Sequence, residues 1–272
     1  MLDRREPRSP DDRKTPGRRT ALITGASAGL GVEFASQLAA RDYDLVLVAR
    51  RLDRLERLAV ELREREGVRV EIIAGDLARA ETPQAIAARV EELGLAVDYL
   101  VNNAGSAGPD LLEDRDWTEQ AAFFQLMLTS MAHLCHLFAP GMGERGFGRI
   151  LNVSSVGGRI ARANDTNYGP SKAYVVALSE SLHLTLKHQG VNVCALCPGF
   201  THTEFHEVAD LLDVKAALPA FMWYDAGTVV REGLAAIERG RCVYVSGRLY
   251  RLIDPILQSV WTRPIIRRFA AR

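Results

Sequence analysis

From Thr20 onward the chain alternates short apolar runs with longer amphipathic stretches. The short runs are nearly continuous in Val, Ile and Leu, which is typical of strands covered on both faces. The longer stretches carry apolar residues at helical spacing and therefore predict helices between the strands. Strands are expected at 21–24, 44–49, 69–75, 97–102, 148–154, 191–197 and 242–247, and helices at about 29–41, 52–66, 82–94, 115–143, 168–189 and 226–239.

This alternation predicts an α/β, single-domain Rossmann fold with right-handed crossovers. Its doubly wound parallel sheet of about seven strands should carry helices on both faces. We expect the catalytic domain over 20–247, with a lid at about 200–225. Residues 1–19 mix charges with proline and have little to bury, so a disordered leader is expected there. A basic amphipathic extension follows over 248–272. Ligands of such sheets bind beyond the carboxyl ends of the strands, so functional residues should directly follow strands.

Charge and composition narrow the choice of partners. Lys plus Arg and Asp plus Glu both number 34, so no net charge draws the chain toward nucleic acid, and we expect none. Four scattered cysteines are too few for a disulfide scaffold. No uninterrupted apolar run reaches the roughly 18 residues of a membrane helix. The N-terminus lacks the apolar core of a secretory signal, and a reducing cytoplasm is the expected location.

A glycine-rich turn follows the first predicted strand and opens the first predicted helix. The stretch TGASAGLG covers residues 24–31. Gly25 suits a tight turn, while Gly29 and Gly31 let the backbone and helix approach a dinucleotide closely. The free N–H groups at the start of the helix then face the pyrophosphate. We therefore predict nucleotide binding, although a plain glycine-rich strand–helix turn has a similar composition.

The end of the second strand indicates which nucleotide is bound. Sites that prefer NAD usually place Asp or Glu there to accept a hydrogen bond from the ribose 2′-hydroxyl. This chain has Ala49 followed by Arg50 and Arg51. A guanidinium can bind a 2′-phosphate through two parallel hydrogen bonds. We predict NADP(H), with Arg50 as the main contact and NAD(H) as the alternative, while Arg51 could equally open a solvated, charged helix.

Polar and small residues follow the later strands as well. Asp76 in GDLA follows the third strand, NNAG at 102–105 follows the fourth, and Ser155 follows the fifth. The sixth strand ends in CPGFTHT, where a turn precedes two threonines that can reach a nicotinamide. The residues of interest there are Pro198, Gly199, Thr201 and Thr203.

A tyrosine and a lysine complete the pattern in DTNYGPSKAY. Tyr168 lies 13 positions after Ser155 and four before Lys172. On a helix this spacing gives the two side chains a common face, and Pro170 between them is tolerated near the helix start. TGxxxGxG, NNAG, Ser, YxxxK and PGxxxT, in this order, resemble the short-chain dehydrogenase/reductase family over roughly 18–247. Each motif is weak alone, but five in register are specific.

The resemblance implies an oxidoreductase that moves a hydride between a nicotinamide and the carbonyl carbon of a small molecule. Tyr168 would be the acid/base and Ser155 would bind the substrate oxygen. Lys172 would contact the ribose and lower the tyrosine pKa from its usual value of about 10. A homodimer or homotetramer is also implied. The predicted cofactor-binding residues are Gly25, Ser27, Ala28, Gly29, Leu30, Gly31, Arg50, Arg51, Asp76, Leu77, Asn103, Ala104, Gly105, Tyr168, Lys172, Pro198, Gly199, Thr201 and Thr203.

One position departs from the family's pattern. Family members commonly carry an Asn on the long fourth helix that holds a water in a proton relay to the catalytic lysine. It lies 25 positions after the first Asn of NNAG and 28 before the catalytic Ser, and both counts give Met127 here. A thioether is at best a weak acceptor. Another water path through Gln125, Thr129 or Ser130 is one interpretation. A nucleotide-binding protein with weak or no turnover is the alternative function.

Two patterns that resemble reactive or metal sites receive a structural interpretation. Cys194 and Cys197 have CxxC spacing, but a strand points them to opposite faces. The histidines lack cysteine or carboxylate neighbours at zinc spacing. No metal site is therefore predicted at His133, His136, His202 or His206.

The lid and the C-terminus carry less specific signals. The lid is rich in large apolar residues, which favours a hydrophobic substrate, although the same residues could pack inside the lid or against another subunit. They are Phe205, Leu211, Leu212, Leu218, Phe221, Met222 and Trp223. The segment 248–272 mixes apolar residues with arginines. Such a segment can lie weakly on an anionic membrane surface, cover a substrate pocket or pack on another subunit.

Overall fold

The computed structural model describes residues 17–203, 219–264 and 268. The expected disordered leader therefore lies outside the described residues except for its last three positions. Of the expected lid, residues 204–218 lie outside them as well, and with them four of the seven apolar residues that favoured a hydrophobic substrate.

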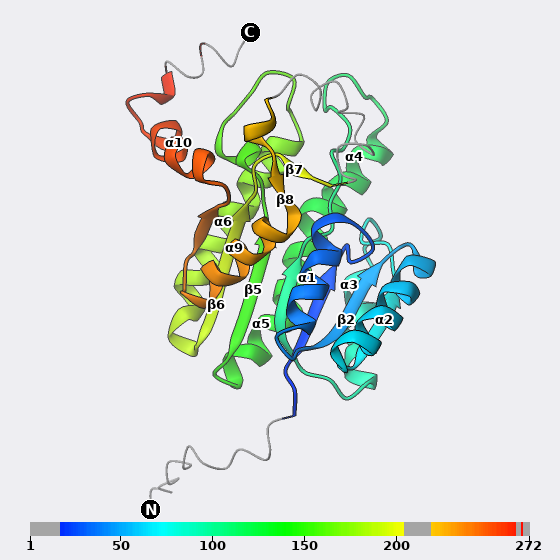
Figure 1. The fold of residues 1–272 in the computed structure, drawn as a ribbon. Coiled ribbons are helices and arrows are strands. Elements are labelled where there is room, and N and C mark those ends of the chain that lie inside the picture. Colours follow the sequence, from blue (N-terminus) through cyan, green and yellow to red (C-terminus); the bar gives the residue numbers. More distant parts are fainter. Residues whose placement is uncertain (1–16, 204–218, 265–267, 269–272) are drawn as a thin grey trace, which may run out of the picture.

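Seven parallel strands form one sheet, which confirms the predicted fold class. The sheet runs β3-β2-β1-β4-β5-β6-β9, so the strand order reverses between β1 and β4 (Figure 1). Apart from one or two residues at their ends, the strands match the apolar runs of the sequence. Their bounds are β1 (Thr20–Thr24), β2 (Asp44–Ala49), β3 (Val70–Ala74), β4 (Val97–Asn102), β5 (Gly148–Val153), β6 (Val191–Cys197) and β9 (Val243–Val245).

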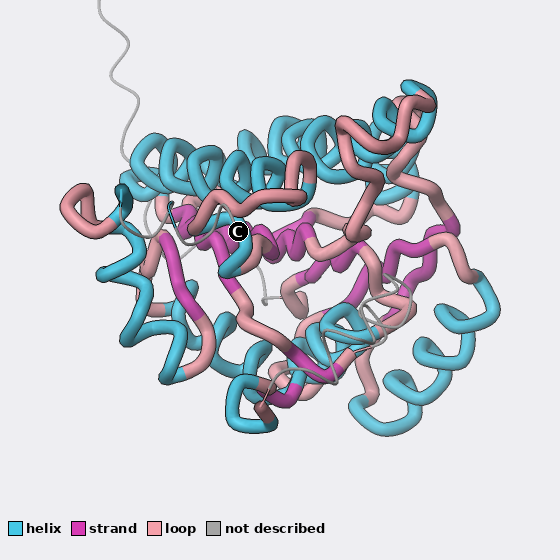
Figure 2. The backbone as a smooth tube through the Cα atoms, turned by 90° about the horizontal axis from the view of Figure 1, so that it is seen from above, coloured by secondary structure: helices cyan, strands magenta, loops and turns pink. Residues whose placement is uncertain are grey.

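Two layers of helices enclose the sheet, as the view along it in Figure 2 shows. Successive residues of a strand point to opposite faces, so Leu22 packs in one core and its neighbours Ala21 and Ile23 in the other. One layer consists of α1 (Gly29–Ala39), α2 (Leu52–Glu66) and α9 (Ala226–Glu238), and the other contains α3 (Thr82–Glu92), α5 (Ser130–Glu144) and α6 (Tyr168–Leu186).

The last crossover corrects the expectation that all crossovers are right-handed. From β4 the sheet is built in one direction through β5 and β6 to β9. The helices α5 and α6 of the first two crossovers lie on one face, but α9 packs against α1 on the opposite face. The β6–α9–β9 connection therefore has the opposite hand. The right-handed preference is a strong tendency and not a strict rule, and β6 and α9 are separated by enough residues for the chain to reach the opposite face.

The expected long helix at 115–143 is divided into three parts. It consists of α4 (Trp117–Phe124), a π-helical turn (Gln125–Thr129) and α5. Such turns often mark functional sites, and this one contains the buried Met127. By length and composition alone, the stretch 117–144 is the one helix among the described residues that is long and apolar enough to cross a membrane. Its α5 part supplies Leu134 and Met142 to the core beside the sheet.

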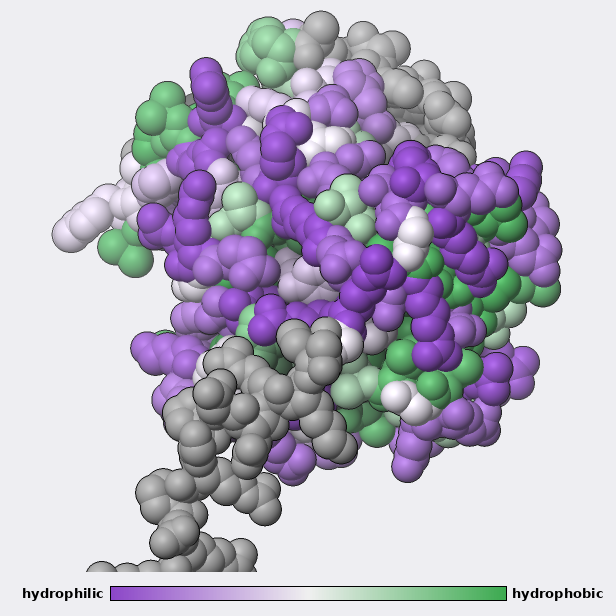
Figure 3. Space-filling view, turned by 60° about the horizontal axis from the view of Figure 1, so that its bottom comes forward, coloured by the Kyte–Doolittle hydropathy of each residue, from purple (hydrophilic) through white to green (hydrophobic). Residues whose placement is uncertain are grey.

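Short elements complete the carboxyl end of the sheet. They are η2 (Val156–Arg159), η3 (Lys187–Gln189), η4 (Ala220–Met222), β7 (Thr201–His202), β8 (Tyr224–Asp225) and α10 (Arg248–Gln258). Figure 1 places α10 at the edge of this end, beside β9 and away from the N-terminus. The opposite end, seen in Figure 3, is covered largely by hydrophilic side chains with scattered hydrophobic ones.

Candidate active site

The glycine turn after β1 is held against the residues that follow β4. The hydroxyl oxygen of Thr24 accepts hydrogen bonds from the backbone N–H groups of Asn103 (3.0 Å) and Ala104 (3.1 Å). Gly25 has a φ of 66°, and a Cβ there would lie 2.8 Å from the Asn103 amide nitrogen. Glycine is therefore required both by the left-handed backbone and by the close approach. TGASAGLG and NNAG form one structural unit at the switch point of the sheet.

The start of α1 is open to a ligand. Its N-cap residue is Ala28, and no side chain caps the first turn. Gly29 follows with a φ of 54°, and a Cβ there would lie 3.2 Å from Cβ of Thr203. The structure thus brings the glycine turn and the loop after β6 together, although more than 170 residues separate them in the sequence. Uncapped N–H groups at a helix start are a ready site for phosphate.

The two arginines after β2 have different surroundings. The side chain of Arg51 donates from Nε and Nη2 to the Ser27 hydroxyl, both at 3.2 Å. Arg51 also precedes α2 as its N-cap residue. Its guanidinium is therefore part of the glycine turn as well as the start of a helix. Arg50 is exposed at the carboxyl end of β2.

The residues after β3 line the same end of the sheet. The Asp76 carboxylate accepts a hydrogen bond from the backbone N–H of Ala78 at 3.0 Å, which closes a short turn. Leu77 is buried, and its carbonyl accepts from the hydroxyl of Ser130 at 2.7 Å. That hydroxyl also accepts from the Gln125 amide at 3.0 Å. The side chains of Gln125 and Ser130 are thus hydrogen-bonded to each other and, through Ser130, to the turn after β3.

Ser155, Tyr168 and Lys172 come together beyond the end of β5. The Ser155 hydroxyl is hydrogen-bonded to Tyr168 and accepts from the backbone N–H of Gly157 at 3.0 Å. α6 begins at Tyr168, as the proline in its first turn requires. The Lys172 ammonium lies 5.6 Å from the centre of the tyrosine ring and donates to the Val153 carbonyl at 2.9 Å.

Burial dominates the protonation of this group. Burial raises the pKa of Tyr168 above its usual value, and the hydrogen bond from Ser155 offsets part of that effect. Burial also lowers the pKa of Lys172 to about 8. Burial outweighs the lowering of the tyrosine pKa that was expected from Lys172, and that role of Lys172 stays a prediction. The Lys172 side chain is buried and that of Tyr168 is partly buried, so the surroundings of each group favour its uncharged form.

Sequence reasoning missed two residues that position the group. A Cβ at Gly158 would lie 2.5 Å from the carbonyl carbon of Lys172, so glycine lets η2 pack directly on α6. The Asp165 carboxylate accepts from the backbone N–H of Gly169 at 2.7 Å, which satisfies a free donor in the first turn of α6. The glycine pair after Ser155 and the aspartate before the helix were the available signals.

Met127 lies against the turn that follows β4. Its side chain is 1% exposed, and its sulfur accepts from the backbone N–H of Ser106 at 3.4 Å. A Cβ at Gly105 would lie 3.2 Å from that sulfur and 3.7 Å from the Lys172 nitrogen. Met127 and the Lys172 ammonium therefore both lie close to Gly105. Thr129 is exposed, on the other side of its helical turn.

The proline–glycine turn after β6 contacts both η2 and α10. The backbone N–H of Val156 donates to the Pro198 carbonyl at 2.9 Å. A Cβ at Gly199 would lie 2.0 Å from the ring of Tyr250, so the ring of α10 covers this turn. Thr201 is buried, and its hydroxyl donates to the Gly199 carbonyl at 3.0 Å.

The cysteines and histidines do not form a second reactive site in the part of the chain that the structure describes. Cys194 and Cys197 are buried in different cores, on opposite faces of β6. Burial raises the pKa of the Cys197 thiol to about 11 and that of Cys194 still further, so neither is a thiolate at neutral pH. His202 stacks on Trp223, with ring centres 5.2 Å apart. No cluster of three metal-ligating side chains occurs in the described residues.

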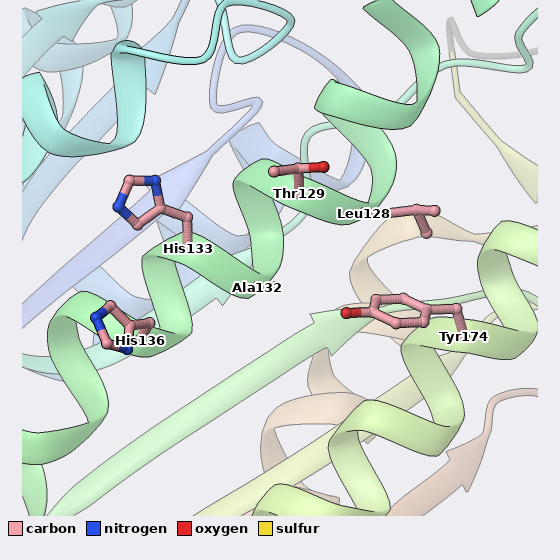
Figure 4. A pocket seen from close by; sticks show the side chains of 6 residues that line it. All are labelled: Leu128, Thr129, Ala132, His133, His136 and Tyr174. Carbon is pink, nitrogen blue, oxygen red and sulfur yellow. The ribbon is translucent and has the colours of Figure 1, made fainter. Parts of the chain in front are cut away.

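Two hollows in the described surface lie away from this group. One, of about 530 Å³, separates the π-helical turn and α5 from α6. Figure 4 shows its lining residues on these facing helices: Leu128, Thr129, Ala132, His133, His136 and Tyr174. The other, of about 320 Å³, lies by Tyr43 and Tyr99 near α1 and α9. Neither hollow contains a residue of the candidate site, so the site is identified from its hydrogen bonds and from the close contacts at its glycines.

Known proteins share both the sequence pattern and the fold. A family model described as short chain dehydrogenase matches residues 19–210. Nodulation protein G of Rhizobium meliloti (strain 1021) is 33% identical over 239 residues, which cover 85% of this chain and 93% of that protein.

Two solved structures superimpose over nearly the whole chain. A short-chain dehydrogenase from Sphingobium yanoikuyae in complex with NADPH has a TM-score of 0.78 and 32% identity, with 90% of this chain and 95% of that chain covered. The bulky-bulky ketone specific alcohol dehydrogenase from Comamonas testosteroni has a TM-score of 0.74 and 29% identity, with 90% and 94% covered.

Proposed function

On the premise that the chain belongs to the short-chain dehydrogenase/reductase family of oxidoreductases, we propose that it interconverts a carbonyl and a secondary alcohol with NADP(H). The observation that carries this proposal is the meeting of Ser155, Tyr168 and Lys172 at the carboxyl end of the sheet, beside the glycine turn.

Each of the three residues has a role that its surroundings support. Ser155 is hydrogen-bonded to the tyrosine hydroxyl and can hold a substrate oxygen in the same place. Tyr168 donates its proton to the alkoxide that forms when the carbonyl is reduced. The raised pKa keeps Tyr168 protonated and ready to donate at neutral pH. Lys172 stabilises the tyrosinate that is left, because its charge is close and screened little from it.

The residues around the glycine turn fit a dinucleotide. The first turn of α1 is uncapped, and Gly25 and Gly29 are in the left-handed backbone conformation. The side chain of Arg51 already reaches Ser27 in this turn, and Arg50 is exposed next to it. When bound, NADPH would supply the hydride. We propose Arg50 as the main 2′-phosphate contact, with Arg51 holding the turn, and NAD(H) as the weaker cofactor.

The substrate that we propose is hydrophobic. Trp223 is 9% exposed and packs on Phe200, with ring centres 5.3 Å apart, close to the turn after β6. Phe221 is 69% exposed at the same end of the molecule. The ketone-specific relative from Comamonas testosteroni adds support for a carbonyl substrate.

A second candidate function follows from Met127. Its thioether lies close to Gly105, as the Lys172 ammonium does, at the position where a polar relay residue was expected. The second candidate is a nucleotide-binding member of the family with weak or no turnover.

Oxidation of NADPH with a panel of ketones and aldehydes distinguishes the two candidates. We expect turnover with an apolar carbonyl compound. The Tyr168→Phe variant should lose this turnover and bind NADPH as tightly as the native chain. Tight NADPH binding without turnover above the Tyr168→Phe control on any compound would reject the first candidate and favour the second.

The remaining proposals concern organisation. We propose residues 20–247 as the catalytic domain, 248–272 as an extension of it, and the cytoplasm as the location. We also propose a homodimer or homotetramer. Exposed apolar surface on α6 supports this assembly, because Tyr174, which lines the hollow of Figure 4, is 41% exposed and Leu184, farther along the helix, is 65% exposed.

A further inference from the structure

The helix α10 differs from an ordinary surface helix in that several of its polar side chains lie against the protein. Three of its polar residues, Arg251, Asp254 and Gln258, make contacts with the protein. Asp254 and Arg159 of η2 form two parallel hydrogen bonds, both of 2.8 Å. Arg251 approaches Glu232 at 3.4 Å, and the Gln258 amide donates to the Arg159 carbonyl. Positions 251, 254 and 258 are spaced i, i+3 and i+7, so they share one face of the helix.

Part of the apolar surface of α10 faces outward, whereas Tyr250 packs on the turn at Gly199. Leu252 is 75% exposed and Ile256, one turn later, is 55% exposed. Val260 and Trp261 continue the surface and are 72% and 85% exposed. Four of the twelve large hydrophobic side chains that are exposed in the described residues thus fall within ten positions. A surface helix usually buries its apolar side, and a cluster of this kind marks an interaction surface.

The charge around this surface is strongly positive. Residues 248–272 contain six arginines and one acid, Asp254, in a chain whose total charge is zero. Asp254 is paired with Arg159 inside the contact, whereas Arg248, Arg263 and Arg268 are exposed. A second copy of the chain would bring the same positive charges to the same apolar surface, and like charges across an interface are unfavourable. Anionic phospholipid offers both the apolar phase and the opposite charge.

The position of α10 gives the surface a consequence for catalysis. Arg159 belongs to η2, which directly follows Ser155, and Tyr250 of α10 covers the turn at Gly199. The helix therefore lies at the carboxyl end of the sheet, where the reacting group lies. A membrane that received the outward side of α10 would lie next to this end of the molecule, and an apolar substrate dissolved in the membrane would be close to it.

We propose that the outward face of residues 248–261, with Leu252, Ile256, Val260 and Trp261 as its apolar part and the exposed arginines at its margin, docks on the surface of an anionic phospholipid membrane. The indole of Trp261 suits the boundary between headgroups and acyl chains, where tryptophan is enriched in membrane proteins. The apolar part of this surface is separate from the proposed reacting group, since Leu252, Ile256, Val260 and Trp261 are exposed whereas Lys172 is buried.

Flotation of the full chain with vesicles tests the proposal. The vesicles are phosphatidylcholine alone or phosphatidylcholine mixed with phosphatidylglycerol, at low and at high salt. We expect the chain to float with the mixed vesicles and to be released by salt. The double variant Leu252→Ser/Trp261→Ser should partition at least about tenfold less. Each of Arg248→Gln and Arg263→Gln should partition about fivefold less.

Matched control variants distinguish the effect of this surface from the effect of substituting any exposed residue. Val60→Ser changes a half-exposed apolar residue on α2, and Arg89→Gln changes an exposed arginine on α3, so neither should alter flotation. Thermal melting checks that the variants fold. The proposal is overturned if the native chain stays with the buffer at low salt, or if the Leu252→Ser/Trp261→Ser variant floats as well as the native chain. It is also overturned if that variant loses a subunit in light scattering, since α10 would then be a contact between copies.

Discussion

At the scale of single residues, the site depends on what burial does to Lys172. Burial lowers the pKa of its amine from 10.5 to about 8. The unfolded chain therefore binds the proton more tightly than the folded chain, so the cost of burying the charged amine is fully present below pH 8. The contribution of Lys172 to stability improves as pH rises from about 8 to 10.5. Catalysis is instead favoured at lower pH, because the charged ammonium of Lys172 is the form that stabilises the tyrosinate.

The first prediction is a pH dependence of carbonyl reduction. We expect kcat/KM to fall as pH rises through about 8, because Lys172 then loses the charge that stabilises the tyrosinate. Steady-state rates between about pH 6 and 10 measure this. Lys172→Arg serves as the comparison, since an arginine keeps its charge and should move the fall to higher pH. A rate that stays level to pH 10 in the native chain would contradict the assignment.

The second prediction concerns the space beside the lysine. Met127→Asn should raise kcat if supply of protons to Lys172 limits the reaction, because an amide holds water far better than a thioether. The variant should also lose about 1–3 kcal/mol of stability, since a polar group is buried in place of an apolar one. Single-turnover rates and chemical denaturation measure the two effects.

Met127→Leu is the control for that experiment. It removes the sulfur that accepts from Ser106 but offers no site for water, so its kcat should not rise. An equal rise in the Asn and Leu variants would mean that repacking, and not proton supply, controls the rate. The other routes considered from the sequence are less suited, since Gln125 and Ser130 are bonded toward Leu77 and Thr129 is exposed elsewhere.

The third prediction separates the two arginines. Arg50→Asp should weaken NADPH at least about tenfold more than NADH, because it removes a charge-assisted contact to the 2′-phosphate. Arg51→Gln should weaken both cofactors by a similar factor, since this side chain holds the turn at Ser27. Fluorescence titration with both cofactors measures the ratios. Arg57→Asp on α2 is the control, and an unchanged ratio in Arg50→Asp would exclude Arg50 as the phosphate contact.

At the scale of elements, the parts that form the site support one another through short polar contacts. Gly158 lets η2 lie on α6, and Arg159 joins η2 to α10. The side chains of Arg159 and Asp254 are 16% and 17% exposed, so their charges are little screened by water. Losing one partner would leave the other charge half-buried and unpaired, which is costly.

The fourth prediction tests this link. Asp254→Asn should lower the free energy of unfolding by about 1–3 kcal/mol and increase hydrogen exchange of the amides in α10. Denaturation and exchange mass spectrometry measure both. Asp53→Asn is the matched control, because its pair with Arg57 is 70% and 74% exposed and should contribute less than about 0.5 kcal/mol. Equal losses in the two variants would show that the Arg159–Asp254 pair is not special.

At the scale of the whole molecule, one sheet brings together residues from every part of the chain. The strands end at one edge, where Thr203 meets Gly29, and α9 packs against α1 on one face of the sheet. The other helical layer leaves an apolar face on α5 and α6 at the hollow of Figure 4. Apolar surface of this kind favours association with a second copy.

The fifth prediction is the size of the particle. Light scattering should give two or four times the protomer mass of 30.0 kDa. Leu184→Arg on α6, where the side chain is 65% exposed, should reduce the mass by placing a charge in the contact. Val60→Arg on α2 should leave it unchanged. A monomeric native chain would reject the proposed assembly.

The sequence by itself determined the order and type of the elements, because continuous apolar runs and helical periodicity are local properties. It also placed each candidate residue after its strand, since the parallel alternation assigns all carboxyl ends to one edge. The hand of the last crossover, the contact of Arg51 with Ser27 and the inward polar side of α10 were decided by the tertiary structure. These features join segments far apart in the chain, and no local pattern encodes which of two faces such a segment meets. The protonation of Tyr168 and Lys172 belongs with them, because burial is a property of everything packed around a group and not of the group itself.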